Sequence, residues 1–121
     1  MRKFAKTHEW YEDLGAGKVK IGISKHAAHE LSDVVFIELP DVGKKLADKQ
    51  SLCVLESVKA VADAYSPAGT VVEVNTKLKD TAGLINQDPE GTGWIAIVQL
   101  DNAKALDEYL TEEQYLSTLT H

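Results

Sequence analysis

The sequence has little of several features on which common protein classes depend. Cys53 is the one cysteine among 121 residues, so no disulfide can form within the chain, and a reducing compartment is expected. The apolar runs are only a few residues long, which is too short for a membrane-spanning helix. The N-terminus, MRKFAKTHEW, has no apolar segment of the kind that a secretory signal requires. We therefore expect neither a disulfide-rich secreted domain nor a helical membrane protein.

Positive charge is also scarce. The 13 basic residues are scattered among 19 acidic ones, and the net charge is −6. An acidic chain is a poor ligand for phosphate backbones, so no nucleic-acid partner is expected. The sequence contains neither a Gly-x-Ser-x-Gly nucleophile motif nor a phosphate-binding Gly-x-x-x-x-Gly-Lys motif. These absences remove the commonest hydrolase and nucleotide-binding classes.

What the chain does contain is a series of short β-like segments between Gly and Pro turns, which predicts a mainly β sandwich or small barrel formed by one domain, residues 1–121. The predicted strands are 18–24, 34–39, 51–57, 71–75 and 94–100. Ser24 is a suitable cap for a short helix over residues 25–31. Asp101 or Asn102 is expected to cap a helix over 103–110. Thr111 is expected to begin a last helix, with two acids in its first turn.

Few side chains suggest chemistry on their own. Cys53 lies inside the apolar run LCVL and is interpreted as a core residue. His26 and His29 share one face of the predicted helix, but without further ligands nearby a solvated face is preferred to a metal site. The loop Asp88–Trp94 is interpreted as a tight connection that places Trp94 in the core, not as a phosphate loop. His8, near Trp10, is either a surface residue or part of a cleft.

Lys59 is distinguished by its position. The stretch LESVKAVADA, Leu55–Ala64, reads as two apolar arms around Val58-Lys59. Two-residue hairpin tips favour Asn-Gly or Asp-Gly, so a Val-Lys tip departs from turn chemistry. Departures from local rules often mark functional sites, and a hairpin tip would present one amine to a modifying enzyme. A solubilising surface lysine is the other interpretation.

The motif around this lysine, ESVKA (Glu56–Ala60), resembles the lipoylation motif of the glycine cleavage system H protein family. Further blocks resemble that family in order and spacing across nearly the whole chain: THEW (7–10), KIGIS (20–24), VVFIELPDVG (34–43), VVEVN (71–75) and LINQDPEGTGW (84–94). The resemblance implies the barrel-sandwich hybrid fold of lipoyl and biotinyl carriers, a flattened β-barrel or sandwich, with a short helix near 24–31 and helices at the C-terminus.

The resemblance also implies a non-catalytic carrier whose Lys59 bears lipoic acid through an amide, with Glu56, Ser57, Val58 and Ala60 as the recognition motif. The implied partners are a glycine decarboxylase, a tetrahydrofolate-dependent aminomethyltransferase, dihydrolipoyl dehydrogenase, and a lipoate ligase or lipoyl/octanoyl transferase. A monomer with small, transient interfaces is expected, because a carrier must release each partner. The compartment implied is the bacterial cytoplasm, or the mitochondrial matrix if a transit peptide has been removed.

In that family the loaded arm folds against polar residues of the carrier. The matching residues here are Thr7, Glu9 and Asp63, with His8 nearby, and a carboxylate among them is suited to pair with an ammonium group. Three positions depart from the family pattern: Ser32 replaces a usual Gly, the turn Ser66–Thr70 is one residue shorter, and Glu90 stands where an aromatic residue is common.

Other interpretations stay open at this point. A biotin carrier has Met on both sides of its lysine, whereas the neighbours here are Val58 and Ala60. Lipoyl domains of 2-oxo acid dehydrogenases usually have Asp before the lysine. An H-like lipoyl-relay or redox-linked signalling protein, and a plain β-rich interaction module with an unmodified lysine, are the remaining alternatives.

Overall fold

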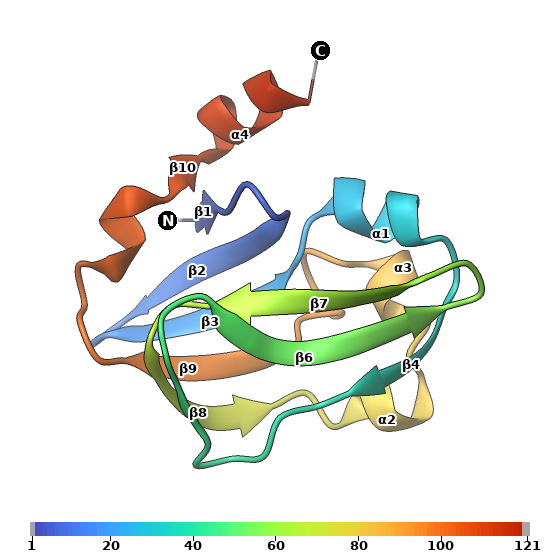
Figure 1. Cartoon of the computed structure of the whole chain (residues 1–121), viewed down its shortest axis with the longest axis horizontal. Helices are drawn as coiled ribbons and strands as arrows, with labels where there is room; N and C mark the ends of the chain where they lie inside the picture. The colour runs from blue at the N-terminus through green and yellow to red at the C-terminus, as the bar shows by residue number, and fades with distance from the viewer. Residues whose placement is uncertain (1, 120–121) are drawn as a thin grey trace.

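A computed structural model describes residues 2–119 of the chain, which form two facing β-sheets (Figure 1). The larger sheet has seven strands in the order β10-β1-β2-β3-β9-β8-β5. In chain order these strands are β1 (Arg2–Phe4), β2 (Glu9–Gly15), β3 (Lys18–Ile23), β5 (Lys45–Leu46), β8 (Gly69–Val74), β9 (Ala96–Leu100) and β10 (Leu110–Thr111). All of its neighbouring strands are antiparallel.

The smaller sheet has three antiparallel strands, β4 (Val34–Glu38), β6 (Gln50–Ser57) and β7 (Val61–Ser66), with β6 in the centre. Residues paired across it share a face. Ile37, Leu55 and Ala62 form an inward row, and Phe36, Glu56 and Val61 form an outward one. The inward side packs against the large sheet, while the outward side faces the viewer in Figure 1. The hairpin β6–β7 extends to the right-hand end of that view.

The main core lies between the sheets, because alternate residues of each strand point inward. Val19, Ile21 and Val98 of the large sheet are fully buried there, together with Leu55 and Ala64 of the small one. The barrel does not close, so the fold is an open sandwich of mainly β structure, as the sequence predicted. Among residues 2–119 no helix is long and apolar enough to cross a membrane.

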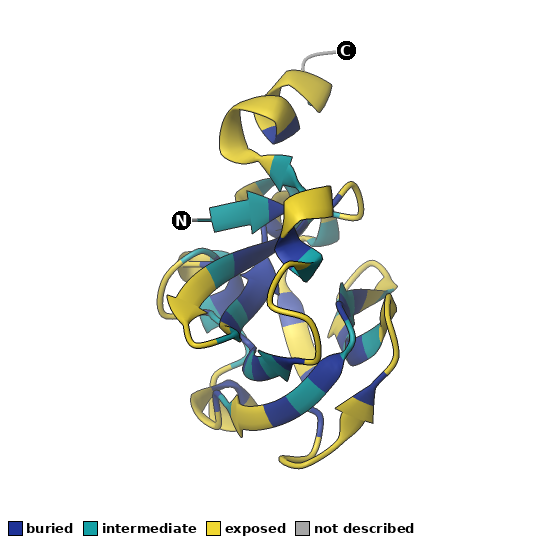
Figure 2. Cartoon of the chain, turned by 90° about the vertical axis from the view of Figure 1, so that its left-hand side faces the viewer, coloured by how far each residue is buried: buried dark blue, intermediate teal, exposed yellow. Residues whose placement is uncertain are grey.

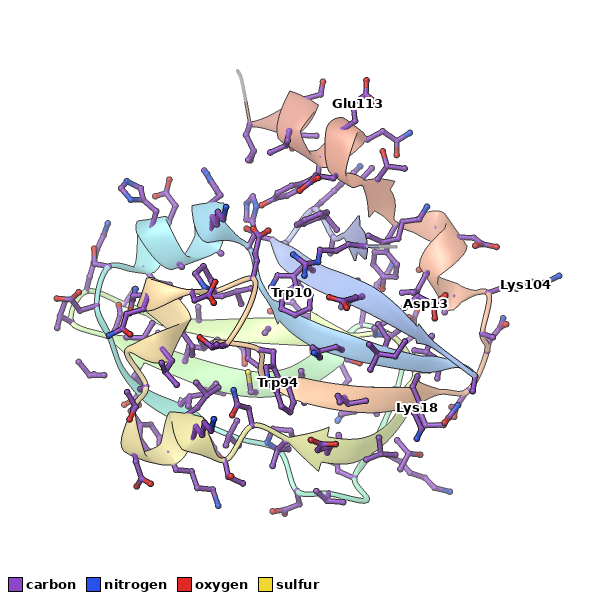
Figure 3. The ribbon with its side chains drawn as sticks, turned by 180° about the vertical axis from the view of Figure 1, so that it is seen from behind. Trp10, Asp13, Lys18, Trp94, Lys104 and Glu113 are labelled. Atoms are coloured by element: carbon purple, nitrogen blue, oxygen red, sulfur yellow. The ribbon has the colours of Figure 1, made fainter. Side chains whose placement is uncertain are left out.

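A second apolar cluster covers the outer side of the large sheet. Trp10 lies over Gly22, where a Cβ would come within 2.7 Å of the indole ring, so only glycine fits. The Trp10 indole N–H donates to the carbonyl of Pro89, 2.9 Å away. Phe4 stacks on Tyr115 with the ring centroids 4.6 Å apart. The prediction that Trp94 lies in the main core was wrong, because Trp94 is half-buried beside this second cluster. Trp10 and Trp94 are both labelled in Figure 3, which shows the molecule from behind.

Two predicted helices are confirmed with their caps. Helix α1 (Lys25–Leu31) begins after Ser24, whose hydroxyl accepts a hydrogen bond from the Ala27 N–H. Helix α4 (Glu112–Thr118) begins after Thr111, which forms a reciprocal capping box with Gln114. Most of α4 is exposed, as Figure 2 shows. Phe4 and Tyr115 therefore provide its main attachment to the sheet.

Residues 103–110 do not form the predicted helix. Only a four-residue 3₁₀ turn, η1 (Ala105–Glu108), is present, and it follows Lys104 rather than Asp101 or Asn102. The chain must become extended at Leu110 to pair with Phe4 on β1, which stops the helix. The short helices α2 (Lys77–Asp80) and α3 (Leu84–Gln87) were not predicted, because one turn of helix has no periodicity to recognise.

Candidate functional site

The tip of the β6–β7 hairpin is a turn closed by a serine side chain. The Ser57 N–H donates to the Ala60 carbonyl at 2.8 Å, and the Ser57 hydroxyl accepts from the N–H groups of Lys59 (3.2 Å) and Ala60 (3.0 Å). Neither Val58 nor Lys59 has a positive φ. Because Ser57 provides the acceptor and no left-handed residue is needed, the turn can contain Val and Lys in place of Asn-Gly.

The tip is also bound to the loop that follows α1. The Val58 N–H donates to the carbonyl of Asp33 at 3.0 Å. Asn86 on α3 holds this loop from the other side. Its amide oxygen accepts from the Val34 N–H at 2.8 Å, and its amide nitrogen donates to the Ser32 carbonyl at 2.6 Å. The position of Lys59 thus depends on three segments that are distant in the sequence.

Lys59 itself is exposed, and its Nζ donates to the carbonyl of Glu30 at 3.2 Å. Glu30 lies in the last turn of α1, where a cation interacts favourably with the free carbonyls. This single contact with a backbone oxygen leaves the amine accessible. A primary amine in this setting is chemically competent for acylation, which would remove its charge.

Glu9, predicted to line a cleft, is 1% exposed. One carboxylate oxygen accepts from the hydroxyl of Thr7, and the other accepts from the Tyr65 N–H at 3.0 Å. Burial raises the pKa of Glu9 above its ordinary value, an effect opposed by these hydrogen bonds. The geometry gives Glu9 a structural part between the sheets, and contact with a loaded arm remains a prediction.

The other predicted cleft residues are not gathered around Glu9. His8 has a positive φ of 78°, and its Nδ1 lies 2.7 Å from the Tyr115 hydroxyl. Burial, and then the neighbouring His26, lower the pKa of His8. Asp63 is exposed on the outward face of the small sheet, where it accepts from the Ser51 hydroxyl at 2.8 Å. Thr7 alone joins Glu9 directly.

A cavity of about 600 Å³ opens beside Thr7. It has aromatic walls and lysines at its rim, and its lining is Phe4, Ala5, Lys6, Thr7, Tyr11, Lys49, Tyr65, Glu108, Tyr109 and Leu110. Apart from Thr7, none of these residues was predicted as part of a site. No local pattern marks them, because the cavity exists only once β10 has paired with β1 and brought Tyr109 toward Tyr11.

Two alternatives to a hairpin site are not supported by geometry. No group of three or more His, Cys, Asp or Glu side chains within residues 2–119 is arranged to hold a metal ion. His26 instead lies 3.6 Å from Glu30 on its own helix. Cys53 is buried as predicted, and burial raises the pKa of its thiol to about 12. Such a thiol stays protonated at neutral pH and is not a nucleophile.

The comparisons with known proteins agree across the chain. The family model "Glycine cleavage H-protein" matches residues 2–121. A glycine cleavage system H protein of Vibrio parahaemolyticus is 48% identical over 97% of this chain and 94% of its own. One from Coprothermobacter proteolyticus is 46% identical over 93% of this chain and 90% of its own. The crystal structure of an H protein from Mycobacterium marinum superposes with a TM-score of 0.89, at 35% identity over 99% of this chain and 97% of that one.

Ser32, in the loop that binds the hairpin tip, has φ 63° and ψ −154°, a region that favours glycine. Replacing Ser32 with Gly is expected to stabilise the chain by about 1 kcal/mol, since the steric strain of the Cβ is removed. Urea unfolding followed by tryptophan fluorescence measures this change. Ser32→Ala keeps the Cβ and should show no gain. Equal stabilities of Ser32→Gly and wild type would show that the loop is unstrained.

The raised pKa of Glu9 has a consequence for stability. A carboxyl with a folded-state pKa above the ordinary 4.5 favours folding most when it is protonated, and this contribution is lost as pH rises through the folded-state value. The free energy of unfolding of wild type minus that of Glu9→Gln should therefore fall as the pH rises above the ordinary value of 4.5 and through the folded-state pKa. Parallel urea titrations at several pH values test this, and a difference that rises with pH would contradict it.

Proposed function

Because the chain belongs to the glycine cleavage H-protein family, we propose that it carries a lipoyl group on Lys59 for the glycine cleavage system. The observation that carries the proposal is the hairpin tip, which holds one accessible amine on a turn fixed by Ser57 and by the Asp33 carbonyl. Residues 1–121 act as one carrier domain, and catalysis belongs to the partner enzymes.

The residues present fit the attachment of a lipoyl group. The deprotonated Nζ of Lys59 attacks an activated lipoyl carbonyl, forming the C–N bond as the bond to the leaving group breaks and a proton passes to solvent. The resulting amide is uncharged and keeps one N–H, so the attraction to the α1 carbonyls weakens and the arm is freed. Glu56, Ser57, Val58 and Ala60 serve as the recognition motif. Ser57 does so through turn shape and Glu56 through an exposed carboxylate.

Lys59 would hold the lipoyl group, whose disulfide would supply the acceptor for the aminomethyl group left by glycine decarboxylation. The disulfide would open as it accepts that group, the tetrahydrofolate-dependent aminomethyltransferase would remove the methylene unit with release of ammonia, and dihydrolipoyl dehydrogenase would re-oxidise the dithiol that remains. The chain's own contribution is presentation, because tethering raises the local concentration of the group at each docked enzyme. We propose a monomer. The named relatives are bacterial, so of the two compartments we propose the bacterial cytoplasm.

We further propose that the loaded arm folds back along β7 toward Asp63 and Thr7. β7 is an edge strand of the small sheet, and the chain from Lys59 to Asp63 spans at most roughly 13 Å if it is extended. Both side chains are exposed and polar. Glu9 supports Thr7 directly, since its carboxylate accepts from the Thr7 hydroxyl, and it holds β7 through the Tyr65 N–H.

Intact mass tests the attachment. After incubation with lipoate, ATP and a lipoate ligase, the wild-type chain should gain one lipoyl increment, and Lys59→Arg should gain none because an arginine guanidinium is not acylated. A biotinyl increment, or a lipoyl increment retained in Lys59→Arg, would refute the assignment.

Glycine–bicarbonate exchange with the cognate decarboxylase then separates glycine cleavage from the relay alternative, which the family match does not favour.

Asp63 is tested through the stability of the loaded state. Asp63→Asn should raise the rate of ammonia release to water, without the tetrahydrofolate enzyme, by roughly two- to fivefold, as expected for one exposed ion pair. Glu38→Gln is the matched control, since Glu38 lies in the same outward row on the opposite edge strand. Equal rates in the two variants would show that the arm does not rest on Asp63.

A further inference from the structure

Helix α4 is joined to the rest of the molecule mainly through one side chain. Tyr115 is 2% exposed and is the one buried residue of α4 in the described part of the chain, whereas Glu112, Glu113 and Leu116 face solvent. Figure 1 shows α4 standing above the strands of both sheets. A helix of seven residues is unstable on its own in water. The structure of α4 therefore depends on how Tyr115 is bound.

Three side chains, Ser24, Tyr115 and His8, form a chain of hydrogen bonds that we call the latch. The Tyr115 hydroxyl lies 2.7 Å from the Ser24 hydroxyl and 2.7 Å from Nδ1 of His8, and the Ser24 hydroxyl also accepts from the Ala27 N–H. Ser24 is 1% exposed, and its hydroxyl has no other partner among residues 2–119. Its hydrogen therefore reaches an acceptor only if Ser24 donates to Tyr115 and Tyr115 donates to His8. Every donor is satisfied when Nδ1 of His8 carries no hydrogen.

Protonation of His8 reverses the direction of this chain. Nδ1 then becomes a donor to the Tyr115 oxygen, so the phenol hydrogen must turn toward Ser24. Because Ser24 Oγ already accepts from Ala27, its own hydrogen is left without an acceptor in a site that water does not reach. The charged ring also lies against His26, with the ring centroids 4.8 Å apart. Neutral His8 therefore favours the docked helix, and protonated His8 disfavours it.

The charged groups that face His8 lie on α1. The His26 ring disfavours protonation of His8, whereas Glu30 favours it, but the Glu30 carboxylate also lies 3.6 Å from Nε2 of His26. Burial, and then His26, outweigh Glu30 and lower the pKa of His8 below its ordinary value of 6.5. Docking of α4 is therefore complete above pH 6.5 and weakens as the pH falls below that value toward the docked-state pKa.

The phenol of Tyr115 does not titrate in the same range. Burial raises the pKa of Tyr115 above its ordinary value of 10.0. The hydrogen bond with Ser24 opposes this effect, and the carboxylates of Glu90 and Glu9 add to it. His8 is thus the member of the latch that changes charge near neutral pH.

His8 is held more firmly than α4. Its backbone has a positive φ of 78°, and the turn is bound on both sides, because the His8 N–H donates to the Ala5 carbonyl at 2.9 Å and the His8 carbonyl accepts from the Ser24 N–H at 2.8 Å. The C-terminal segment, by contrast, pairs with β1 at two positions, Leu110 and Thr111. A change in the latch therefore displaces α4 rather than the ring of His8.

We propose that the latch makes the docking of the C-terminal segment, residues 108–118, depend on the protonation of His8. Residues 108–110 of this segment form one wall of the cavity of about 600 Å³. With His8 neutral the segment is docked and the wall is complete, and with His8 protonated the segment leaves and the cavity opens on that side. The inference does not depend on the lipoyl group, because the unmodified chain contains every group involved.

Hydrogen exchange tests the latch in the full-length unmodified chain. Mass spectrometry follows overlapping peptides over residues 109–118 from about pH 8 to about pH 5. The ratio of the exchange rate in wild type to that in His8→Asn removes the intrinsic effect of pH, because Asn accepts the positive φ and offers an acceptor to Tyr115 without titrating. The ratio should be level above pH 6.5 and rise by about threefold or more below it. A ratio that stays constant over the whole range overturns the inference.

Three further variants separate the latch from a general effect of acid. His29→Asn removes an exposed histidine from the same helix and should keep the pH dependence of wild type. His26→Asn removes the ring that disfavours protonation and should move the rise to higher pH. Tyr115→Phe keeps the stack on Phe4 but breaks the latch, so it should exchange faster than wild type above pH 6.5 and show a smaller rise below it.

Two outcomes would contradict the inference in different ways. Loss of the pH dependence in His29→Asn would show that the effect does not come from His8. Faster exchange confined to residues 112–118, with residues 109–111 unchanged, would show that the cavity wall stays in place when α4 leaves. If His8→Asn does not fold, His8→Gly takes its place, since glycine also accepts the positive φ.

Discussion

The backbone N–H and C=O of Tyr65 are both bound by side chains from the opposite sheet, and the arrangement of the molecule depends on this contact. Glu9 accepts from the Tyr65 N–H at 3.0 Å, and the Tyr11 hydroxyl donates to the Tyr65 carbonyl at 2.8 Å. Both come from β2 of the large sheet, whereas β7 is an edge strand of the small one. An edge strand has free backbone groups that would otherwise need a further strand or water. The two side chains supply these bonds and fix the spacing of the sheets.

This contact fixes the base of the hairpin, and the loop after α1 fixes its tip. Between them β6 pairs with β7 along the hairpin and with β4 from Val54 to Ser57, so the half of β6 next to the tip has a strand on each side. The freedom that remains at Lys59 is that of its side chain, which is the part that a carrier has to move. A mobile backbone at the tip would instead cost ordering entropy each time a partner docked.

Whether a feature could be predicted from the sequence depends on how far apart in the sequence its interacting residues lie. The caps at Ser24 and Thr111 are local, involving residues three positions apart, and both were predicted. Apolar patterns between turn residues likewise predicted β3, β4, β6, β8 and β9, whereas the two-residue strand β5 (Lys45–Leu46) was not predicted. Glu9 was predicted only to line a cleft; its burial depends on Tyr65, which is distant in the sequence, so no local pattern indicates it. The 3₁₀ turn at Ala105–Glu108 was missed for the same reason, because the pairing of Leu110 with Phe4 overrides local helix propensity.

Two of the departures from the family pattern, at Glu90 and Ser32, have opposite effects on the structure. Glu90 replaces a common aromatic residue, yet its carboxylate accepts from the Lys25 N–H at the start of α1 and from Arg2, which also lies over Trp10. It therefore links the N-terminal strand to α1. Ser32 has the opposite effect, because it introduces a Cβ at a backbone conformation suited to glycine. Asn86 donates to the Ser32 carbonyl and accepts from the Val34 N–H, and these two hydrogen bonds hold the loop in that conformation. The carbonyl of the adjacent Asp33 binds the hairpin tip. One loop therefore determines both the backbone conformation at Ser32 and the position of Lys59, and Asn86 stabilises that loop.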